Sequence, residues 1–305
     1  MPLESSKKIL LIILSVAGVI RLWGLGELGM GFFRDEAALG YNIYSMALTG
    51  KDEFAKSFPI IFRSFEVFFL PLYVYLSVPI VWVLGLSVFS TRLLSAIAGV
   101  VAVGGVYYLA GVLPAILLAT SAWHIFFSRG TFEGNLALTV FLLGVCFWVK
   151  YLKDRKLKYL SISLLTTVIS MYGYQSERLV VPLWWMCNLA IYKKDLPRKF
   201  VEWFKVLLFP VLLGLPLLFI WFSPAGLHRA QGVSLFSANA NTSKSITNLV
   251  WKISAMYSHY FSPKNLFWEG DYDKQRSLLG LSVFYWLWIV GWVNGIILVF
   301  WIFKN

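Results

Sequence analysis

Long apolar runs separated by short polar connections dominate the pattern along this chain. The runs lie at 8–25, 92–111, 114–128, 134–150, 158–174, 179–192, 203–222 and 281–302. Because roughly 20 apolar residues cross the hydrocarbon core as a helix, the pattern predicts an all-α polytopic membrane protein with about eight transmembrane helices. A membrane barrel is excluded, since its strands would alternate apolar and polar residues and these runs do not.

A further apolar stretch, 68–85, contains Pro71 and Pro79. Hydropathy alone does not decide whether it crosses the membrane, so we use the distribution of charge as a second criterion. If it does not cross the membrane, the basic clusters at 150–158 and 193–199 fall on the same side as the basic N-terminus. If it crosses, both clusters move to the opposite side, against the positive-inside rule. We therefore interpret 68–85 as a helix lying at the interface, in a multi-pass protein of the cytoplasmic membrane whose N-terminus is cytoplasmic.

Composition supports the membrane assignment and excludes one class of partner. Hydrophobic residues make up 59% of the 305 residues and charged residues only 14%, well below the roughly one quarter of soluble domains. The net charge of +12 follows the positive-inside rule in short loops, so we expect no nucleic-acid partner. Cys146 and Cys187 both lie inside apolar runs and make neither a disulfide framework nor a metal site.

The predicted topology gathers most acidic residues on the extracytoplasmic face, leaving only Glu4, Asp154, Asp195 and Glu202 on the other side. We interpret 1–305 as a single transmembrane domain with two large outer loops, 26–91 and 223–280. Charged motifs then share the outer face: RDE at 34–36, STR at 90–92, SRGTFEGN at 128–135, YGYQSERLVVP at 172–182 and HYFSPKNLFWEGDYDKQR at 259–276.

These charged residues have a structural and a chemical interpretation. Asp35 could cap a helix that begins at Glu36, because carboxylates stabilise a helix N-terminus. Arg92, Arg129 and Arg178 could anchor the outer ends of spans by snorkelling. An acidic pair and three arginines on one face instead favour an enzyme, because guanidinium groups bind phosphate in a bidentate manner.

Five segments carry a family resemblance: 34–37, 71–76, 85–99, 124–133 and 172–182. In order and spacing they resemble the membrane glycosyltransferases of the family 39 type, which take a sugar from a polyprenyl-phosphate donor. That group includes the protein O-mannosyltransferases, the aminoarabinose transferases acting on lipid A, and short bacterial or archaeal members. By this resemblance we expect the C-terminal extension of longer relatives to be absent, as in a minimal member or a truncated reading frame.

The resemblance implies a GT-C fold whose first outer loop carries two juxtamembrane helices. It also implies inverting transfer to an acceptor hydroxyl on the outer face, with Asp35 as the base and Glu36 as its partner in the catalytic pair. Arg92, Arg129 and Arg178 would bind the donor phosphate. Further expected substrate contacts are Arg34, Glu133, Tyr174, Gln175, His259 and Asp271.

The implied partners are a polyprenyl-phosphate-linked sugar, an acceptor that is a glycolipid, glycan or protein, and membrane lipids. We expect no cofactor and no metal. Trp184-Trp185 lacks the following acid of the metal-dependent oligosaccharyltransferase branch, and His259, Asp271 and Asp273 are interpreted as loop residues or acceptor contacts. Two other functions stay open from the residues alone: a flippase or transporter for a lipid-linked glycan, and an inactive scaffold of a glycosylation complex.

Overall fold

The structure is a computed structural model that describes residues 3–28, 31–64, 67–223, 246–269 and 282–304. The chain forms two compact units. Unit 1 comprises Met1–Ala119 and Phe127–Ala230, and unit 2 comprises Thr120–Phe126 and Gln231–Asn305. Each unit is described by itself.

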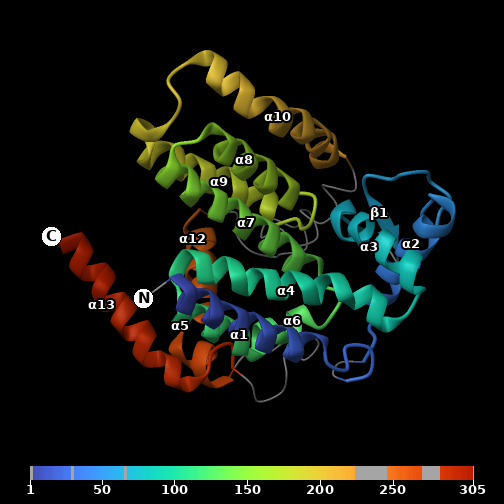
Figure 1. Cartoon of the computed structure of the whole chain (residues 1–305), viewed down its shortest axis with the longest axis horizontal. Helices are drawn as coiled ribbons and strands as arrows, with labels where there is room; N and C mark the ends of the chain where they lie inside the picture. The colour runs from blue at the N-terminus through green and yellow to red at the C-terminus, as the bar shows by residue number, and fades with distance from the viewer. Residues whose placement is uncertain (1–2, 29–30, 65–66, 224–245, 270–281, 305) are drawn as a thin grey trace. The chain divides into compact units, whose positions relative to one another are not determined.

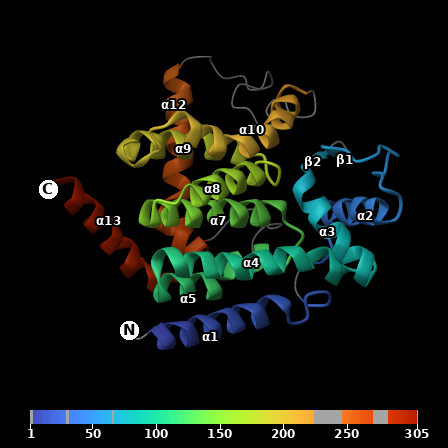
Figure 2. The ribbon, with the colours of Figure 1, turned by 45° about the horizontal axis from the view of Figure 1, so that its top comes forward.

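Unit 1 is a row of apolar helices. Its members α1 (Leu3–Leu22), α4 (Val88–Ala110), α7 (Glu133–Asp154), α8 (Leu157–Ser170) and α10 (Phe200–Phe222) lie side by side in that order (Figures 1 and 2). Among the described helices, α4, α7 and α10 are long and apolar enough to cross a membrane. The predicted all-α polytopic membrane architecture is therefore confirmed.

Small and polar residues allow these helices to pack closely. A Cβ atom on Gly144 of α7 would lie 2.5 Å from the side chain of Thr167 on α8. Ser163 donates to the Gly144 carbonyl at 2.7 Å, and Asn135 donates to the Ser95 carbonyl of α4 at 2.9 Å. Within apolar surroundings such close approaches and interhelical hydrogen bonds hold helices together where the hydrophobic effect does not.

The apolar run predicted as one span at 114–128 instead forms two short helices. α5 (Val112–Thr120) ends before Ser121, and α6 (Ala122–Ser128) follows. Arg21 of α1 is buried, and its Nη1 donates to the Ala119 carbonyl at 3.0 Å while Nη2 donates to the Leu118 carbonyl at 3.2 Å. A cation therefore satisfies the last carbonyls of α5, which explains how this helix can end inside an apolar run.

The predicted outer loop at 26–91 forms a small subdomain at one end of α4 (Figure 1). It contains α2 (Arg34–Thr49), the antiparallel hairpin β1 (Phe62–Ser64) and β2 (Val67–Phe69), and α3 (Pro71–Leu84). The sequence predicts a helix here that does not cross the membrane. With 14 residues, α3 is about 21 Å long against a hydrocarbon core of about 30 Å. The core of the subdomain includes Leu39, Ile43, Phe62, Tyr73 and Val74.

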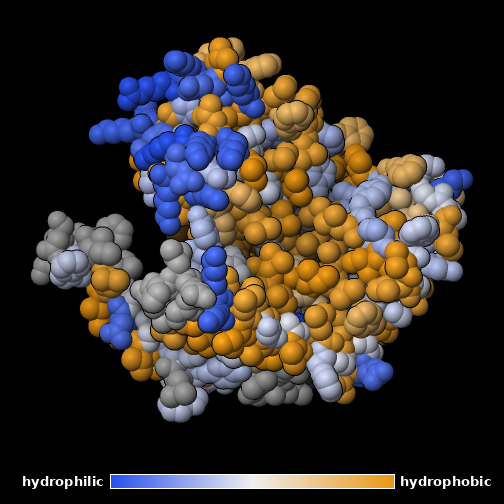
Figure 3. Space-filling model, in the orientation of Figure 1, coloured by the Kyte–Doolittle hydropathy of each residue, from blue (hydrophilic) through white to orange (hydrophobic). Residues whose placement is uncertain are grey.

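The connections before α4, α7 and α9 (Glu177–Ile191) meet this subdomain, and we call this end of unit 1 the site end. The opposite, basic end contains the clusters 150–158 and 193–199, where hydrophilic side chains gather (Figure 3). Arg155 pairs with Asp195 across these clusters at 2.7 Å. Both basic clusters thus lie at one end, as the charge argument requires, and the orientation in a membrane stays a prediction.

Unit 2 contains α12 (Ile246–Tyr260), the short helices η2 (Asn265–Glu269) and η3 (Trp286–Trp288), and α13 (Ile289–Lys304). Aromatic rings of this unit contact one another, and the ring centroids of Phe267 and Phe284 lie 5.9 Å apart. Much of the predicted loop 223–280, namely 224–245 and 270–280, lies outside the described residues. The predicted span at 281–302 corresponds to η3 and α13.

Candidate functional site

A buried ion pair joins Glu36 and Arg92 at the site end. Arg92 Nε lies 2.8 Å from Glu36 Oε1 and Nη2 lies 2.6 Å from Oε2, so the pair is bidentate. Glu36 is 0% exposed and Arg92 is 2% exposed. The backbone N–H of Thr131 donates to Glu36 Oε1 at 2.7 Å. Three segments that are far apart in the sequence are therefore held by one carboxylate.

Local sequence explains how these groups reach one another. α2 begins directly after the extended residue Phe33, which places Glu36 in its first turn, where a carboxylate is favourable. α4 begins after a capping box in which Ser87 and Ser90 satisfy each other's backbone N–H groups, and Arg92 follows in the next turn. A buried charge pair is tolerated only when its hydrogen bonds are satisfied, as they are here.

Asp35 has the opposite environment from its neighbour. Its side chain is 47% exposed, and it forms a long ion pair with Arg34, whose Nε lies 3.9 Å away and whose side chain is 67% exposed. The interpretation of Asp35 as the N-cap of a helix starting at Glu36 is wrong, because the N-cap residue of α2 is Phe33 and no side chain caps it. Pinning Glu36 inward therefore leaves Asp35 at the surface, available to a ligand.

Sequence reasoning did not single out Tyr73, which lies beside the buried pair. Its hydroxyl donates to the Thr91 carbonyl at 2.8 Å, and its side chain is fully buried. Burial raises the pKa of Tyr73, and the negative charges of Glu36 and Glu133 raise it further. Tyr73 thus stays a proton donor. Its position in the segment 71–76, which carries part of the family resemblance, was the available signal.

Arg129 is committed to the end of α1. Its Nη1 donates to the carbonyls of Ile20 and Trp23, both at 2.8 Å, and its Nη2 donates to those of Gly24 at 3.2 Å and Leu28 at 3.1 Å. A helix end carries partial negative charge and unsatisfied carbonyls, so a guanidinium there is a C-terminal cap. Arg129 was predicted to bind the donor phosphate, and in the structure its guanidinium is hydrogen-bonded to backbone carbonyls.

Arg178 differs from the other two predicted arginines. It occupies the second position of α9, and its side chain makes no hydrogen bond or ion pair with any described residue. Its Nε is buried without a hydrogen-bond partner in the described part of the chain. Guanidinium N–H groups are strong donors that are normally satisfied, so this arginine is equipped to bind a ligand.

The segment that carries Arg178 packs on the start of α7 and α3. The Tyr172 carbonyl accepts from Leu72 N at 3.1 Å. A Cβ on Gly173 would lie 2.8 Å from Ala137, and one on Gly134 would lie 3.7 Å from the ring of Tyr174. Tyr174 thus packs on the first turn of α7.

The remaining predicted residues lie in different places. Glu133 begins α7, and its Oε1 accepts from Leu70 N at 3.3 Å, which again joins α7 to α3. Gln175 lies in the turn before α9, where its carbonyl accepts from Arg178 N. His259 belongs to α12 of unit 2 and is exposed. Asp271 lies outside the described residues, so its contribution stays a prediction.

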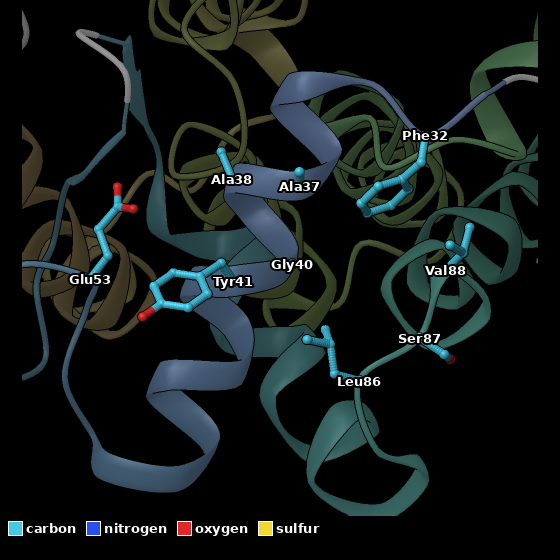
Figure 4. Close-up of a pocket in the computed structure, with 9 residues that line it drawn as sticks. All are labelled: Phe32, Ala37, Ala38, Gly40, Tyr41, Glu53, Leu86, Ser87 and Val88. Atoms are coloured by element: carbon cyan, nitrogen blue, oxygen red, sulfur yellow. The ribbon is translucent and has the colours of Figure 1, made fainter.

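A cavity of about 530 Å³ opens beside α2 (Figure 4). Tyr41 and Glu53 flank one side of it, and Phe32 lies opposite (Figure 4). Oxygen Oε1 of Glu53 is buried without a hydrogen-bond partner among the described residues. The lining is otherwise mostly apolar and comprises Ala37, Ala38, Gly40, Leu86, Ser87 and Val88. Among the described residues, no group of three or more His, Cys, Asp or Glu side chains could hold a metal ion.

Comparison with known proteins identifies the fold. No protein family profile and no curated sequence matches the chain. Two crystal structures of ArnT from Cupriavidus metallidurans match its structure at 13% identity. The apo form covers 85% of this chain with a TM-score of 0.54, and the form bound to undecaprenyl phosphate covers 86% with a TM-score of 0.50. The matches cover 49% and 50% of those two structures, so the chain spans about half their length.

These likenesses show that the chain has the polytopic helical membrane fold of the ArnT structures. At this identity they show the fold alone.

Proposed function

We propose that this chain is an integral-membrane glycosyltransferase. It moves a sugar from a polyprenyl-phosphate donor to an acceptor hydroxyl at the extracytoplasmic face of the cytoplasmic membrane. The observation that carries the proposal is the exposed Asp35 held beside the buried Glu36–Arg92 pair. The crystal structure of ArnT with undecaprenyl phosphate supports a lipid phosphate as the ligand of this fold.

In the proposed reaction Asp35 acts as the base. The acceptor oxygen forms a bond to the anomeric carbon while its proton passes to the Asp35 carboxylate. The bond between the anomeric carbon and the phosphate oxygen breaks, and the lipid phosphate leaves with that electron pair. Attack from the face opposite the phosphate inverts the anomeric centre. A phosphate leaves without protonation, so one carboxylate and a cation are sufficient.

Glu36 cannot take this role as readily as Asp35. Both of its oxygens are bonded to Arg92, and Oε1 also accepts from Thr131 N. We therefore assign Glu36 as a positioning residue that fixes the first turn of α2. Tyr73 supports the same arrangement by holding α3 to the start of α4 through the Thr91 carbonyl.

Among the three arginines predicted to bind the donor phosphate, Arg178 is the best candidate. Arg92 is paired with Glu36, and Arg129 donates to the carbonyls at the end of α1. Arg178 retains a buried Nε without a partner in the described part of the chain. A guanidinium with open donors provides the charge-assisted hydrogen bonds that a phosphate requires.

Reconstitution tests the proposal. The purified chain in liposomes is supplied with undecaprenyl-phosphate mannose, glucose or aminoarabinose, and with a serine-rich peptide or lipid A as acceptor. Mass spectrometry should detect a new glycosidic bond for at least one combination. Movement of the lipid-linked sugar across the bilayer without a new bond would instead identify a flippase.

A further inference from the structure

Glu177 is a buried acid at the site end that the proposed reaction leaves unused. The residue is 6% exposed, and its Oε2 has no hydrogen-bond partner among the described residues. A carboxylate oxygen without a partner is costly to bury, because it loses the hydrogen bonds that water would provide. Unsatisfied buried polar atoms in native proteins are uncommon and call for a functional explanation.

The position of Glu177 is fixed by the turn that precedes it. The Tyr172 carbonyl accepts a hydrogen bond from the backbone N–H of Leu72 in α3, and Tyr174 packs on Gly134 in the first turn of α7. Thr131, just before α7, donates to Glu36. Glu177 therefore begins α9 at the same end of unit 1 that presents Asp35.

The next residue carries the complementary group. Arg178 Nε is also buried without a partner in the described part of the chain, and the two side chains form no ion pair with each other. Neighbouring residues of a helix point about 100° apart, so Glu177 and Arg178 present an acceptor and a donor in two directions. A ligand that satisfies both must carry hydrogen-bond donors close to an anion.

A sugar linked to a phosphate has this chemistry, since its hydroxyl groups donate and its phosphate oxygens accept. We propose that Glu177 binds a hydroxyl group of the donor sugar while Arg178 binds the adjoining phosphate. This inference rests on the proposed transferase function and adds a residue that selects the sugar. Glu177 transfers no proton in the reaction and is a specificity residue.

Binding measurements on the purified full chain test this assignment. The probes are undecaprenyl phosphate, which has no sugar, and the three sugar-bearing donors named above. In the wild-type protein at least one sugar-bearing donor should bind more tightly than undecaprenyl phosphate. Glu177→Gln should weaken binding of that donor about tenfold and leave undecaprenyl phosphate within about twofold. Ser176→Ala, at the exposed neighbouring position, is the matched control and should change neither.

Donors that each lack one sugar hydroxyl sharpen the test. Removing the hydroxyl that Glu177 binds should weaken binding to the wild type and have little further effect on Glu177→Gln. Unchanged donor binding by Glu177→Gln, or an equal loss for lipids with and without sugar, would overturn the assignment. If Glu177→Gln fails to fold, Glu177→Asp replaces it, and an unaltered ranking of the three donors would then overturn it. Failure of the wild type to bind any of these lipids would refute the proposed function itself.

Discussion

The guanidinium of Arg129 lies 2.8 Å from the carbonyl oxygen of Trp23, at the end of a helix that begins more than 100 residues earlier. Together with its bonds to Ile20 and Leu28, this contact makes Arg129 the C-terminal cap of α1. Replacing Arg129 with alanine would leave these carbonyls without their charged donor. We expect a loss of about 1–3 kcal/mol in the free energy of unfolding.

Thermal and denaturant unfolding in detergent measure this effect. Arg34→Ala is the control, because Arg34 is exposed at the same end, and we expect its unfolding to stay close to the wild type. A stable Arg129→Ala protein that has lost affinity for undecaprenyl phosphate would show that Arg129 is a phosphate ligand instead.

The buried Glu36–Arg92 pair should strongly couple the effects that mutating its two members has on the free energy of unfolding. Removing either partner leaves a buried charge uncompensated, so Glu36→Gln and Arg92→Gln should each cost about 3–5 kcal/mol. The double variant should cost less than the two single changes together, because no charge is left without its partner. Unfolding of all four proteins in detergent gives the coupling free energy. Additive costs would contradict the ion pair.

Gly99 of α4 predicts a steric effect. A Cβ there would lie 2.3 Å from Ser128 Oγ and 2.7 Å from Ser128 Cβ, which is closer than real contacts. Gly99→Ala should therefore destabilise the protein by about 1–3 kcal/mol. Gly104 on the same helix is the matched control, since its nearest neighbour, Leu14, would be 3.7 Å away. Gly104→Ala should be neutral or slightly stabilising. Equal melting temperatures for the two variants would contradict this packing of α4.

The buried Glu177 should make the free energy of unfolding depend on pH. Burial raises the pKa of Glu177 to about 7, from an ordinary value of 4.5. The folded state therefore prefers the protonated carboxyl, so its contribution to stability is complete below about pH 4.5 and is lost as the pH rises through about 7. The difference is about 3 kcal/mol. Glu177→Gln should remove this step from the pH profile of unfolding.

Two other charged groups near Glu177 must be considered when the pH profile of unfolding is interpreted. Arg178 is the neighbouring cation in the sequence, and Glu133 begins the adjacent helix α7. Glu133→Gln should retain the fall in stability between pH 4.5 and 7 if Glu177 causes it. A profile that is the same with and without the Glu177 carboxyl would contradict the assignment.

The pattern of apolar runs was sufficient to predict the helical membrane fold, because length and hydropathy alone identify α4, α7 and α10. The break between α5 and α6 could not be predicted from the run 114–128, because the cation that satisfies the end of α5 is Arg21 of α1. Local sequence does not record which distant side chain reaches a helix end.

The candidate site likewise combines residues that the sequence identifies with contacts that only the folded structure determines. Glu36 and Arg92 were chosen from charge and order along the chain, and the structure brings them into contact. Arg129 carries the same charge in a similar position, yet only the three-dimensional arrangement places it on backbone carbonyls. Tyr73 and Glu177 were missed because burial distinguishes them, and burial at a helix end depends on how neighbouring helices pack.

Sugar transfer by the Asp35→Asn variant tests the central claim most directly. The variant keeps the shape of the side chain and removes the base, so transfer from an undecaprenyl-phosphate sugar should fall about 100-fold or more. Binding of undecaprenyl phosphate should be retained, and Asp154→Asn at the basic end should keep full activity. Transfer by Asp35→Asn at the wild-type rate would contradict the role of Asp35 as the base.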